Sequence, residues 1–427
     1  MLKNTIIKPE EFKQHLKSLS LFPKDTKIAV AVSGGADSLC LAFLLQNIAK
    51  SLPFSLTALI VDHKLRKEST TEAKWVSSLL TKHKINNIIL TRHESVLTTK
   101  IQEVARWDRY QLLYNYCKEN AYSHLLLAHH LDDSLETMVM RKEKGNNLVG
   151  LAGISAKHVC EEVILLRPLL PYTKEQILQT IRLYTNTWVE DPSNLNEKFT
   201  RVKIRQELQQ LTALQKQQYI NELQQNIHIR KVLETNLLKL LANSLIISNL
   251  GAVQVKLAVL LSADINLQLM YVRKVMQLLA GANYLVKLQK SKRLLNFFHN
   301  KKLKTYTVGG CIFKKKEDYI YIYKEVKDRT KLEIVKNLAH NRWDNRFLID
   351  NTVNKDYIVQ YISLQLYRQL ITDSAFKLFM KNNFVTFKEL QDIPCIFSKN
   401  IQQSWHNQQY KGVLLKFSTS LFMNKFV

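Results

Sequence analysis

Apolar runs alternate with amphipathic stretches along the first half of the chain. Four short runs rich in β-branched and aliphatic residues are typical of buried strands: residues 28–32, 54–61, 87–90 and 123–128. Stretches whose apolar residues recur at helical spacing lie before, between and after them: residues 10–21, 39–45, 71–83, 102–120 and 174–184. Strands that alternate with helices predict βαβ units and a parallel sheet, so we expect an α/β domain at the N-terminus.

The pattern changes near residue 206, beyond which Gln, Leu and Lys dominate. Apolar spacing predicts helices over 206–245, with a break, and over 266–279. Residues 302–325 alternate between polar and apolar side chains, which predicts a β-hairpin or meander. We therefore expect three parts: the α/β domain over 1–212, a mainly helical, basic domain over 213–325 and a small α+β domain over 326–427.

A Ser/Gly turn joins the first predicted strand to the helix that follows it. Its residues are Ser33, Gly34, Gly35, Ala36, Asp37 and Ser38. Paired glycines let backbone N–H groups approach an anion closely, and a helix N-terminus favours negative charge. Asp37 would repel a phosphate unless Mg²⁺ lay between the carboxylate and the phosphate oxygens. The turn predicts a phosphate site, and a turn without a ligand is the alternative.

Two further polar motifs follow predicted strands. Asp62 and His63 end the strand at 54–61, and His129 and His130 follow the strand at 123–128. The carboxyl ends of parallel strands meet at one edge of a sheet, where ligands bind. We therefore expect these two motifs and the Ser/Gly turn to lie together.

Carboxylates cluster directly after the second of these motifs, at Asp132, Asp133 and Glu136. If a helix begins near Asp132, then Asp133 and Glu136 share one of its faces. Neighbouring carboxylates repel each other unless they hold Mg²⁺ or a cationic substrate. For Asp132 a helix N-cap is an equally good interpretation.

Charge and composition point to a polyanionic partner. The 427 residues carry a net charge of +26, and residues 287–316 contain ten Lys or Arg and no acid. A uniform compositional bias would not remove acids from one stretch alone, so we expect a face that binds nucleic acid phosphates. Five scattered cysteines without a C-x-x-C pair, no signal peptide and no membrane-length apolar run favour a cytoplasmic protein.

Together these motifs resemble the tRNA(Ile)-lysidine synthase family of PP-loop ATP pyrophosphatases. SGGADS carries the superfamily signature, whereas HHLDDSLET and the helix motif EVARWDRY at 103–110 narrow the resemblance to the lysidine branch. GLAGI at 150–154, WVEDPSN at 188–194 and RVKIR at 201–205 add to it. The chain departs from the family pattern at four positions: Lys64 for Gly, Ser134 for Gln, Asn147 for Gly and Val202 for Asn.

The resemblance implies a Rossmann-like PP-loop fold and a two-step ligation. The wobble cytidine of the CAU anticodon of tRNA(Ile) attacks the α-phosphate of ATP, pyrophosphate leaves and the base is adenylated. The ε-amine of free lysine then attacks C2, and AMP leaves. The product, lysidine, pairs with A, so that decoding changes from AUG to AUA.

The resemblance also implies roles for individual residues. The catalytic set is Asp37, Asp133 and Glu136, of which Asp37 holds Mg²⁺ and the other two receive or deprotonate the lysine ammonium. The ATP set is Ser33, Gly34, Gly35, Ala36, Asp37, Ser38, Asp62, His63 and Arg109. The set for the other substrates is His129, His130, Arg106 and Arg205. For any single Arg, a salt bridge on a helix surface is the alternative.

Three other functions are alternatives to lysidine formation. A PP-loop tRNA thiolase needs cysteines to carry sulfur or a cluster, usually as C-x-x-C, which this chain lacks. A non-catalytic tRNA-binding PP-loop protein would not need the acids at Asp37, Asp133 and Glu136. An amidotransferase-type synthetase needs an ammonia-producing partner domain, and none is evident. A homodimer is compatible with the sequence.

Overall fold

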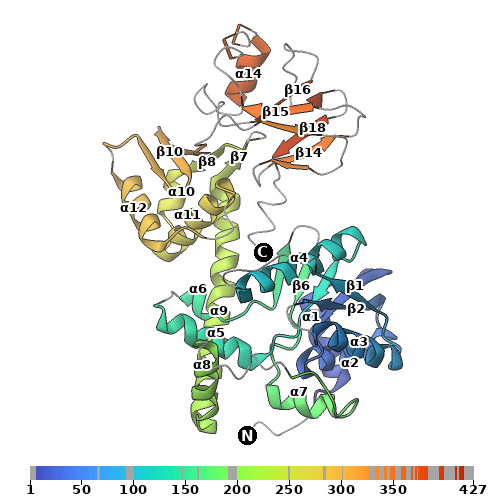
Figure 1. Ribbon diagram of the computed structural model, residues 1–427. Coiled ribbons are helices and arrows are strands. Elements are labelled where there is room, and N and C mark those ends of the chain that lie inside the picture. The colour runs from blue at the N-terminus through green and yellow to red at the C-terminus, as the bar shows by residue number, and fades with distance from the viewer. Residues whose placement is uncertain are drawn as a thin grey trace. The chain divides into compact units, whose positions relative to one another are not determined.

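The structure is a computed structural model of the 427-residue chain, and it divides into two compact units, Met1–Lys231 and Val232–Val427 (Figure 1). It describes residues 6–64, 68–92, 101–145, 148–160, 163–190, 200–248, 251–281, 285–300 and 302–326, followed by shorter segments between 332 and 417. Within the described residues, no helix is long and apolar enough to cross a membrane.

A six-stranded sheet of order β3-β2-β1-β4-β6-β5 forms the centre of the first unit (Figure 1). Its strands are β1 (Thr26–Val32), β2 (Phe54–Asp62), β3 (Asn87–Thr91), β4 (His124–Leu126), β5 (Lys157–Cys160) and β6 (Val163–Leu166). Neighbouring strands run parallel except β5, which pairs antiparallel with β6. The predicted parallel α/β sheet is confirmed, whereas the short strands β5 and β6 were not predicted.

Helices cover both faces of this sheet because the side chains of β1 alternate between two apolar cores. Ile28, Val30 and Val32 pack in one core with four helices, and Ala29 packs in the other with a fifth. The four are α1 (Pro9–Leu19), α2 (Ala36–Ala49), α3 (Ser69–Lys82) and α7 (Lys174–Ile181); the fifth is α4 (Ile101–Glu119). Each of the five overlaps a predicted helix; α1, α3 and α4 match within two residues at both ends, α2 is longer than predicted, and α7 ends three residues earlier.

Four more helices complete this unit: α5 (Leu131–Glu143), α6 (Leu148–Leu151), α8 (Thr200–Gln209) and α9 (Ala213–Ser244), whose last turns continue into the second unit. The break predicted within 206–245 falls between α8 and α9. Thr212 and Gln215 form a capping box there, since Thr212 N donates to Gln215 Oε1 at 2.9 Å and Gln215 N donates to Thr212 Oγ1 at 3.3 Å.

The second unit contains an antiparallel sheet of order β7-β8-β11-β10-β9 beside its helices. Its elements are β7 (Leu245–Ile247), β8 (Val253–Lys256), α10 (Leu257–Leu261), α11 (Ile265–Leu279), α12 (Leu288–His299), β9 (Thr305–Val308), β10 (Cys311–Lys316) and β11 (Tyr319–Lys324). The meander predicted at 302–325 is confirmed by the pairing of β9, β10 and β11. Because β7 and β8 join it, this part is less purely helical than the sequence predicts.

The described segments beyond residue 331 form two further sheets, of order β12-β15-β16 and β13-β14-β18-β17, and one helix, α14 (Ser374–Asn382). Their strands are β12 (Leu332–Val335), β13 (Asn341–Trp343), β14 (Phe347–Asn351), β15 (Tyr357–Tyr361), β16 (Pro394–Ser398), β17 (Gln409–Tyr410) and β18 (Val413–Phe417).

His124 is a buried titratable group at the start of β4, with 3% of its surface exposed. Its two ring nitrogens lie 2.8 Å from Ser123 Oγ and 2.9 Å from Ser20 Oγ. Burial, helped by the charge of Lys157, lowers the pKa of His124 to about 4 from an ordinary value of 6.5. The folded state therefore favours the neutral imidazole, and acid favours the unfolded state.

We expect the folded protein to lose stability as pH falls from about 6.5 toward 4. Between pH 7 and pH 5 the loss attributable to His124 is about 2 kcal/mol, because only the unfolded imidazole takes up a proton in that range. Urea unfolding of the wild type and of His124→Gln at both pH values measures it. The variant should show a smaller pH dependence, and an equal dependence in both proteins would contradict the assignment.

Candidate active site

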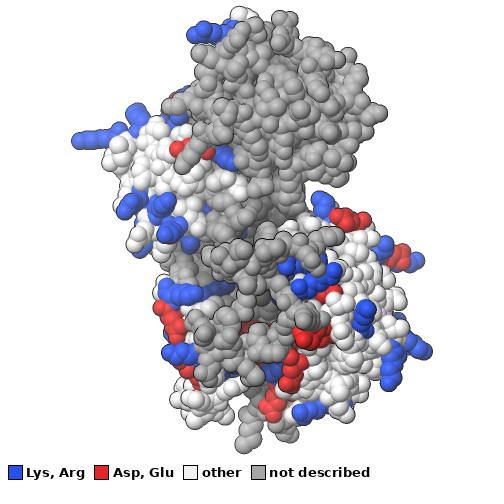
Figure 2. Space-filling view, in the orientation of Figure 1, with Lys and Arg blue, Asp and Glu red and all other residues white. Residues whose placement is uncertain are grey.

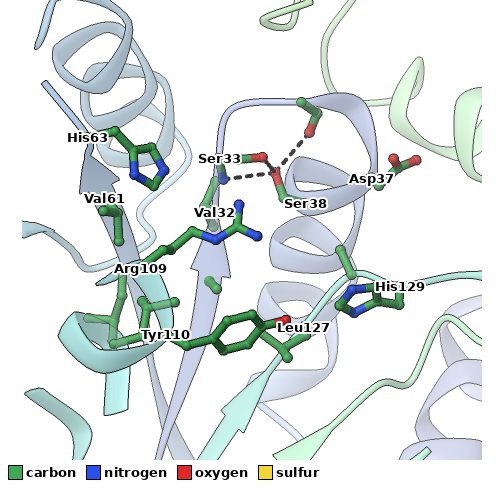
Figure 3. Close-up of a pocket in the computed structure, with 15 residues that line it drawn as sticks. Val32, Ser33, Asp37, Ser38, Val61, His63, Arg109, Tyr110, Leu127 and His129 are labelled. Atoms are coloured by element: carbon green, nitrogen blue, oxygen red, sulfur yellow. Dashed lines mark hydrogen bonds between the residues drawn. The ribbon is translucent and has the colours of Figure 1, made fainter. Parts of the chain in front are cut away.

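The Ser/Gly turn is a closed loop between β1 and α2. Ser33 N donates to Ser38 Oγ at 3.1 Å, and Ser38 Oγ donates to Gly35 O at 2.9 Å (Figure 3). Gly34 has φ = +88°, and a Cβ built there would lie 2.6 Å from Val76 Cγ2. Only glycine fits this position, because a side chain would meet both backbone strain and a packed core.

A cavity of about 200 Å³ lies beside this loop. Seven residues predicted to bind ATP or another substrate line it: Ser33, Gly35, Asp37, Ser38, His63, Arg109 and His129. They come from the segments after β1, β2 and β4, from the first turn of α2 and from α4. The predicted meeting of the three motifs at one sheet edge is thereby confirmed. Figure 3 shows the Arg109 side chain extending from α4 toward the Ser33–Ser38 turn.

The rest of the cavity wall is apolar and was not predicted. It consists of Ala31, Val32, Leu59, Val61, Leu113, Leu127, Ala128 and the ring of Tyr110. The Arg109 guanidinium lies 5.7 Å from the centre of the Tyr110 ring. One side of the cavity thus offers hydroxyl and cationic groups to phosphate, and the other offers an apolar surface to a flat ring. In the sequence, the tyrosine of the EVARWDRY motif, Tyr110, was the signal that could have predicted this wall.

Three other predicted ATP or substrate residues take different positions. Asp62 is 2% exposed and accepts hydrogen bonds from Thr70 Oγ1 at 2.7 Å and Lys64 N at 3.1 Å, so it shapes the loop after β2. Ala36 is buried at the first position of α2. Arg106 belongs to α4, and its side chain lies outside the described residues.

The predicted carboxylate cluster occupies the first turns of α5. Asp133 Oδ2 accepts a hydrogen bond from His130 N at 3.0 Å. Glu136, 2% exposed, accepts two bonds from one guanidinium: Arg205 Nε lies 2.7 Å from its Oε1 and Arg205 Nη2 lies 3.3 Å from its Oε2. This fork is the geometry that pairs Arg with carboxylates most strongly.

The side chain of Arg205 interacts electrostatically with all three predicted catalytic acids. The hydrogen bond with Glu136 raises the pKa of Arg205 most; burial opposes it, and the negative charges of Glu136, Asp133 and Asp37 raise it further. The three carboxylates therefore act on one cationic group, the Arg205 guanidinium.

His130 lies among the same acids. Its side chain is 7% exposed, and its Nε2 is 3.6 Å from Asp133 Oδ2 and 3.8 Å from Asp37 Oδ2. His129, in contrast, lines the cavity. The two adjacent histidines therefore lie in different regions of the site: His129 at the cavity and His130 among the carboxylates.

Two lysines that were not predicted as site residues form ion pairs with Asp37 and Asp132. Lys174 Nζ lies 2.5 Å from Asp37 Oδ1, and Lys216 Nζ lies 2.9 Å from Asp132 Oδ1. Asp132 Oδ2 also accepts a bond from Lys174 N at 2.8 Å. Although burial acts to raise the pKa of Asp132, these bonds hold it below its ordinary value. No local sequence signal marks either lysine, because the acids that they meet are distant in the chain.

Asp37 was also predicted to hold Mg²⁺. The described residues contain no group of three or more His, Cys, Asp or Glu side chains that could hold a metal ion. Mg²⁺ is commonly held by one or two carboxylates together with substrate phosphates. Asp37 fits that pattern, since it is partly exposed, lines the cavity and lies in the first turn of α2.

Comparisons with known proteins show what this chain is similar to. The family model described as a PP-loop domain matches residues 7–212. Among solved structures, a U34-tRNA thiolase from Methanococcus maripaludis is similar, at 18% identity and a TM-score of 0.44, over 52% of this chain and 78% of the other.

Curated relatives match most of the chain. A tRNA(Ile)-lysidine synthase from Orientia tsutsugamushi is 31% identical over 356 residues, which cover 80% of each chain. A second, from Wolbachia pipientis wMel, is 31% identical over 334 residues, 76% of each chain. The alignment with these relatives extends well past the PP-loop domain into the second unit. The chain therefore belongs to the tRNA(Ile)-lysidine synthase family.

Proposed function

We propose that this protein ligates lysine to the wobble cytidine of a tRNA(Ile) with a CAU anticodon, at the expense of ATP, which is cleaved to AMP and pyrophosphate. The observation that carries the proposal is that the first unit contains two sites suited to ligands of opposite charge. A cavity with phosphate-binding groups and an apolar wall suits ATP, and the region formed by Asp37, Asp133 and Glu136 suits a cation.

The cavity supports the first half-reaction, in which cytidine attacks the α-phosphate of ATP. Ser33, Ser38 and the N-terminus of α2 would bind the pyrophosphate that leaves. Arg109 extends toward the same turn and would stabilise negative charge on the phosphates. The apolar wall beside Tyr110 suits a base or its sugar.

Magnesium would be held by Asp37 and the phosphate oxygens. When bound, the ion supplies charge neutralisation at the reacting phosphate. In this structure the Asp37 carboxylate pairs with Lys174. Lys174 therefore balances the charge of Asp37.

The carboxylate region supports the second half-reaction. The Arg205 guanidinium bonds to Glu136 in this region. This contact supports the proposal that the carboxylate region prefers a cationic ligand. The ammonium group of lysine carries the same charge and would be received by Asp133 and Glu136. One of these carboxylates, or His130 between Asp133 and Asp37, would take the proton that the ε-amine must lose before it attacks C2.

The second unit supports binding of tRNA. The helix α12 buries Leu294, Leu295, Phe297 and Phe298 and exposes Lys290, Lys292 and Arg293. Among the charged side chains that Figure 2 shows over this part of the surface, Lys and Arg are more frequent than Asp and Glu. Lys302 and Lys304 are exposed just beyond the helix. Such a face suits the phosphate backbone of RNA.

One lysine of the basic stretch has a different role. Lys315 Nζ donates to Phe297 O at 2.6 Å and to Asn300 O at 2.7 Å, at the C-terminus of α12. Its ammonium thus interacts with carbonyl groups at the helix C-terminus, where cations are favoured. We therefore exclude Lys315 from the proposed phosphate-binding face.

The first prediction from the proposed function concerns Asp37. Asp37→Asn keeps the side-chain shape and removes the charge that would hold Mg²⁺, so we expect a folded protein that no longer releases pyrophosphate. The matched control is Asp25→Asn, an exposed change of the same charge outside the site. Release is measured with labelled ATP and tRNA. Release near the wild-type rate from folded Asp37→Asn would contradict the proposed Mg²⁺ role.

The second prediction separates the two half-reactions. ATP and tRNA without lysine should yield pyrophosphate and adenylated tRNA with little AMP, and added lysine should release AMP one-for-one with lysine incorporated. Glu136→Gln should slow AMP release more than pyrophosphate release, because it removes charge where the ammonium binds. Arginine and ornithine should substitute poorly, since guanidinium is a weak nucleophile and ornithine is one methylene shorter.

A quench time course of labelled ATP with tRNA, followed by a lysine chase, measures both steps. Glu222→Gln is the control, because Glu222 forms an exposed ion pair with Lys142. Full AMP release without lysine, or release triggered by sulfide, would refute lysidine formation. Slowing of the pyrophosphate step alone in Glu136→Gln would refute the assigned division between the two sites.

The third prediction concerns the basic face. Changing Lys302 and Lys304 to Gln should weaken tRNA binding and flatten its salt dependence by roughly 0.7–0.9 in log–log slope for each phosphate that the variant no longer binds. ATP binding should be unchanged. Lys301, which continues this basic run in the sequence, lies outside the described residues. The same two changes at the exposed Lys17 and Lys24 control for net charge, and an unchanged slope in the Lys302/Lys304 variant would count against this face.

A further inference from the structure

Lys64 adopts a backbone conformation that L-residues rarely take. Its φ is +49°, in the left-handed region, where the Cβ of a side chain crowds the backbone and glycine is favoured. A lysine at this position therefore costs free energy that a glycine would not. Such outliers are a reason to examine what the side chain does.

The other positive-φ residues that carry a side chain are explained by turns and helix ends. Among the described residues, Lys84 and Ala121 follow the ends of α3 and α4, Glu317 lies in the turn between β10 and β11, and Asp25 lies in the turn before β1. Lys64 lies in the loop after β2 and not at a helix end. It follows the carboxyl end of β2, at the sheet edge where the other site motifs lie.

The conformation of Lys64 is fixed by a buried carboxylate. Asp62 Oδ1 accepts a bond from Lys64 N at 3.1 Å, and Asp62 Oδ2 accepts a bond from Thr70 Oγ1 at 2.7 Å. Asp62 thus ties the residue after β2 to the first turn of α3. Glycine or asparagine would accept the same geometry, so the backbone does not require a lysine.

The side chain of Lys64 is an exposed cation beside the phosphate cavity. The residue before it, His63, lines that cavity together with Ser33, Asp37 and Arg109. Within the described part of the chain, no carboxylate forms a salt bridge with the Lys64 ammonium. Its charge therefore remains available to an anion that approaches this edge.

We propose that Lys64 binds a phosphate group of a substrate at the rim of the cavity. This inference rests on the proposed function, which brings two phosphate-bearing molecules to this edge, ATP and the tRNA backbone. A flexible lysine side chain at the rim reaches either, and a charge-assisted contact offsets the cost of the left-handed backbone.

Three substitutions separate charge from backbone. Lys64→Gly and Lys64→Asn remove the charge and tolerate the positive φ, so both should fold, and Lys64→Gly should melt at a higher temperature than the wild type. Lys64→Arg keeps the charge. We expect Gly and Asn to weaken equilibrium binding of one phosphate-bearing substrate roughly five- to tenfold, and Arg to retain most of the affinity.

Two binding measurements identify which phosphate is contacted. Weaker binding of ATP alone indicates a nucleotide phosphate. Weaker binding of tRNA, with a salt dependence flatter by roughly 0.7–0.9 in log–log slope, indicates the RNA backbone. Wild-type affinity of Lys64→Gly and Lys64→Asn for both ligands would overturn the proposal. An equal loss of affinity in Lys64→Arg would also overturn it, because charge would then not be the cause.

Both measurements are made at equilibrium and do not depend on turnover. Lysine incorporation by the wild type, measured alongside, tests the proposed function separately. A wild type that does not incorporate lysine would refute that function, whereas the Lys64 contact is decided by the binding of ATP and tRNA.

Discussion

The repulsion among four carboxylates is the constraint on which the site depends. Asp37, Asp132, Asp133 and Glu136 gather at one edge of a sheet, three of them within the first two turns of α5. Negative charges this close are stable only with compensating cations. The cations come from three separate helices: Lys174 from α7, Arg205 from α8 and Lys216 from α9.

This compensation also organises the fold around the site. Each ion pair attaches one helix to the edge where the phosphate loop lies, and apolar contacts support it, since Leu135 and Met138 of α5 pack with Ile220 and Leu223 of α9. The arrangement divides the work between two neighbouring regions. Hydroxyl and guanidinium groups line the cavity and carboxylates lie beside it, which suits the proposed reaction between a phosphate-activated base and an amine.

Several elements followed from local sequence alone. Alternating apolar runs indicated the parallel strands because a buried strand needs apolar side chains on both faces. The Gly34 turn and the break before Thr212 and Gln215 were readable because they depend on residues within a few positions of each other. Short strands such as β7 and β8 were not, because three or four residues carry little periodicity and pair only once β11 is in place.

The sequence by itself determined the α/β order, the glycine loop, the acids of α5 and their meeting at one sheet edge. Each of these follows from short-range spacing and the rules of parallel sheets. Only the tertiary structure decided which cation meets which acid, because Lys174, Arg205 and Lys216 are 137, 69 and 84 residues from their partners. It also decided that Lys64 has a left-handed backbone, since φ at that residue is set by the buried Asp62 and its bond to Thr70.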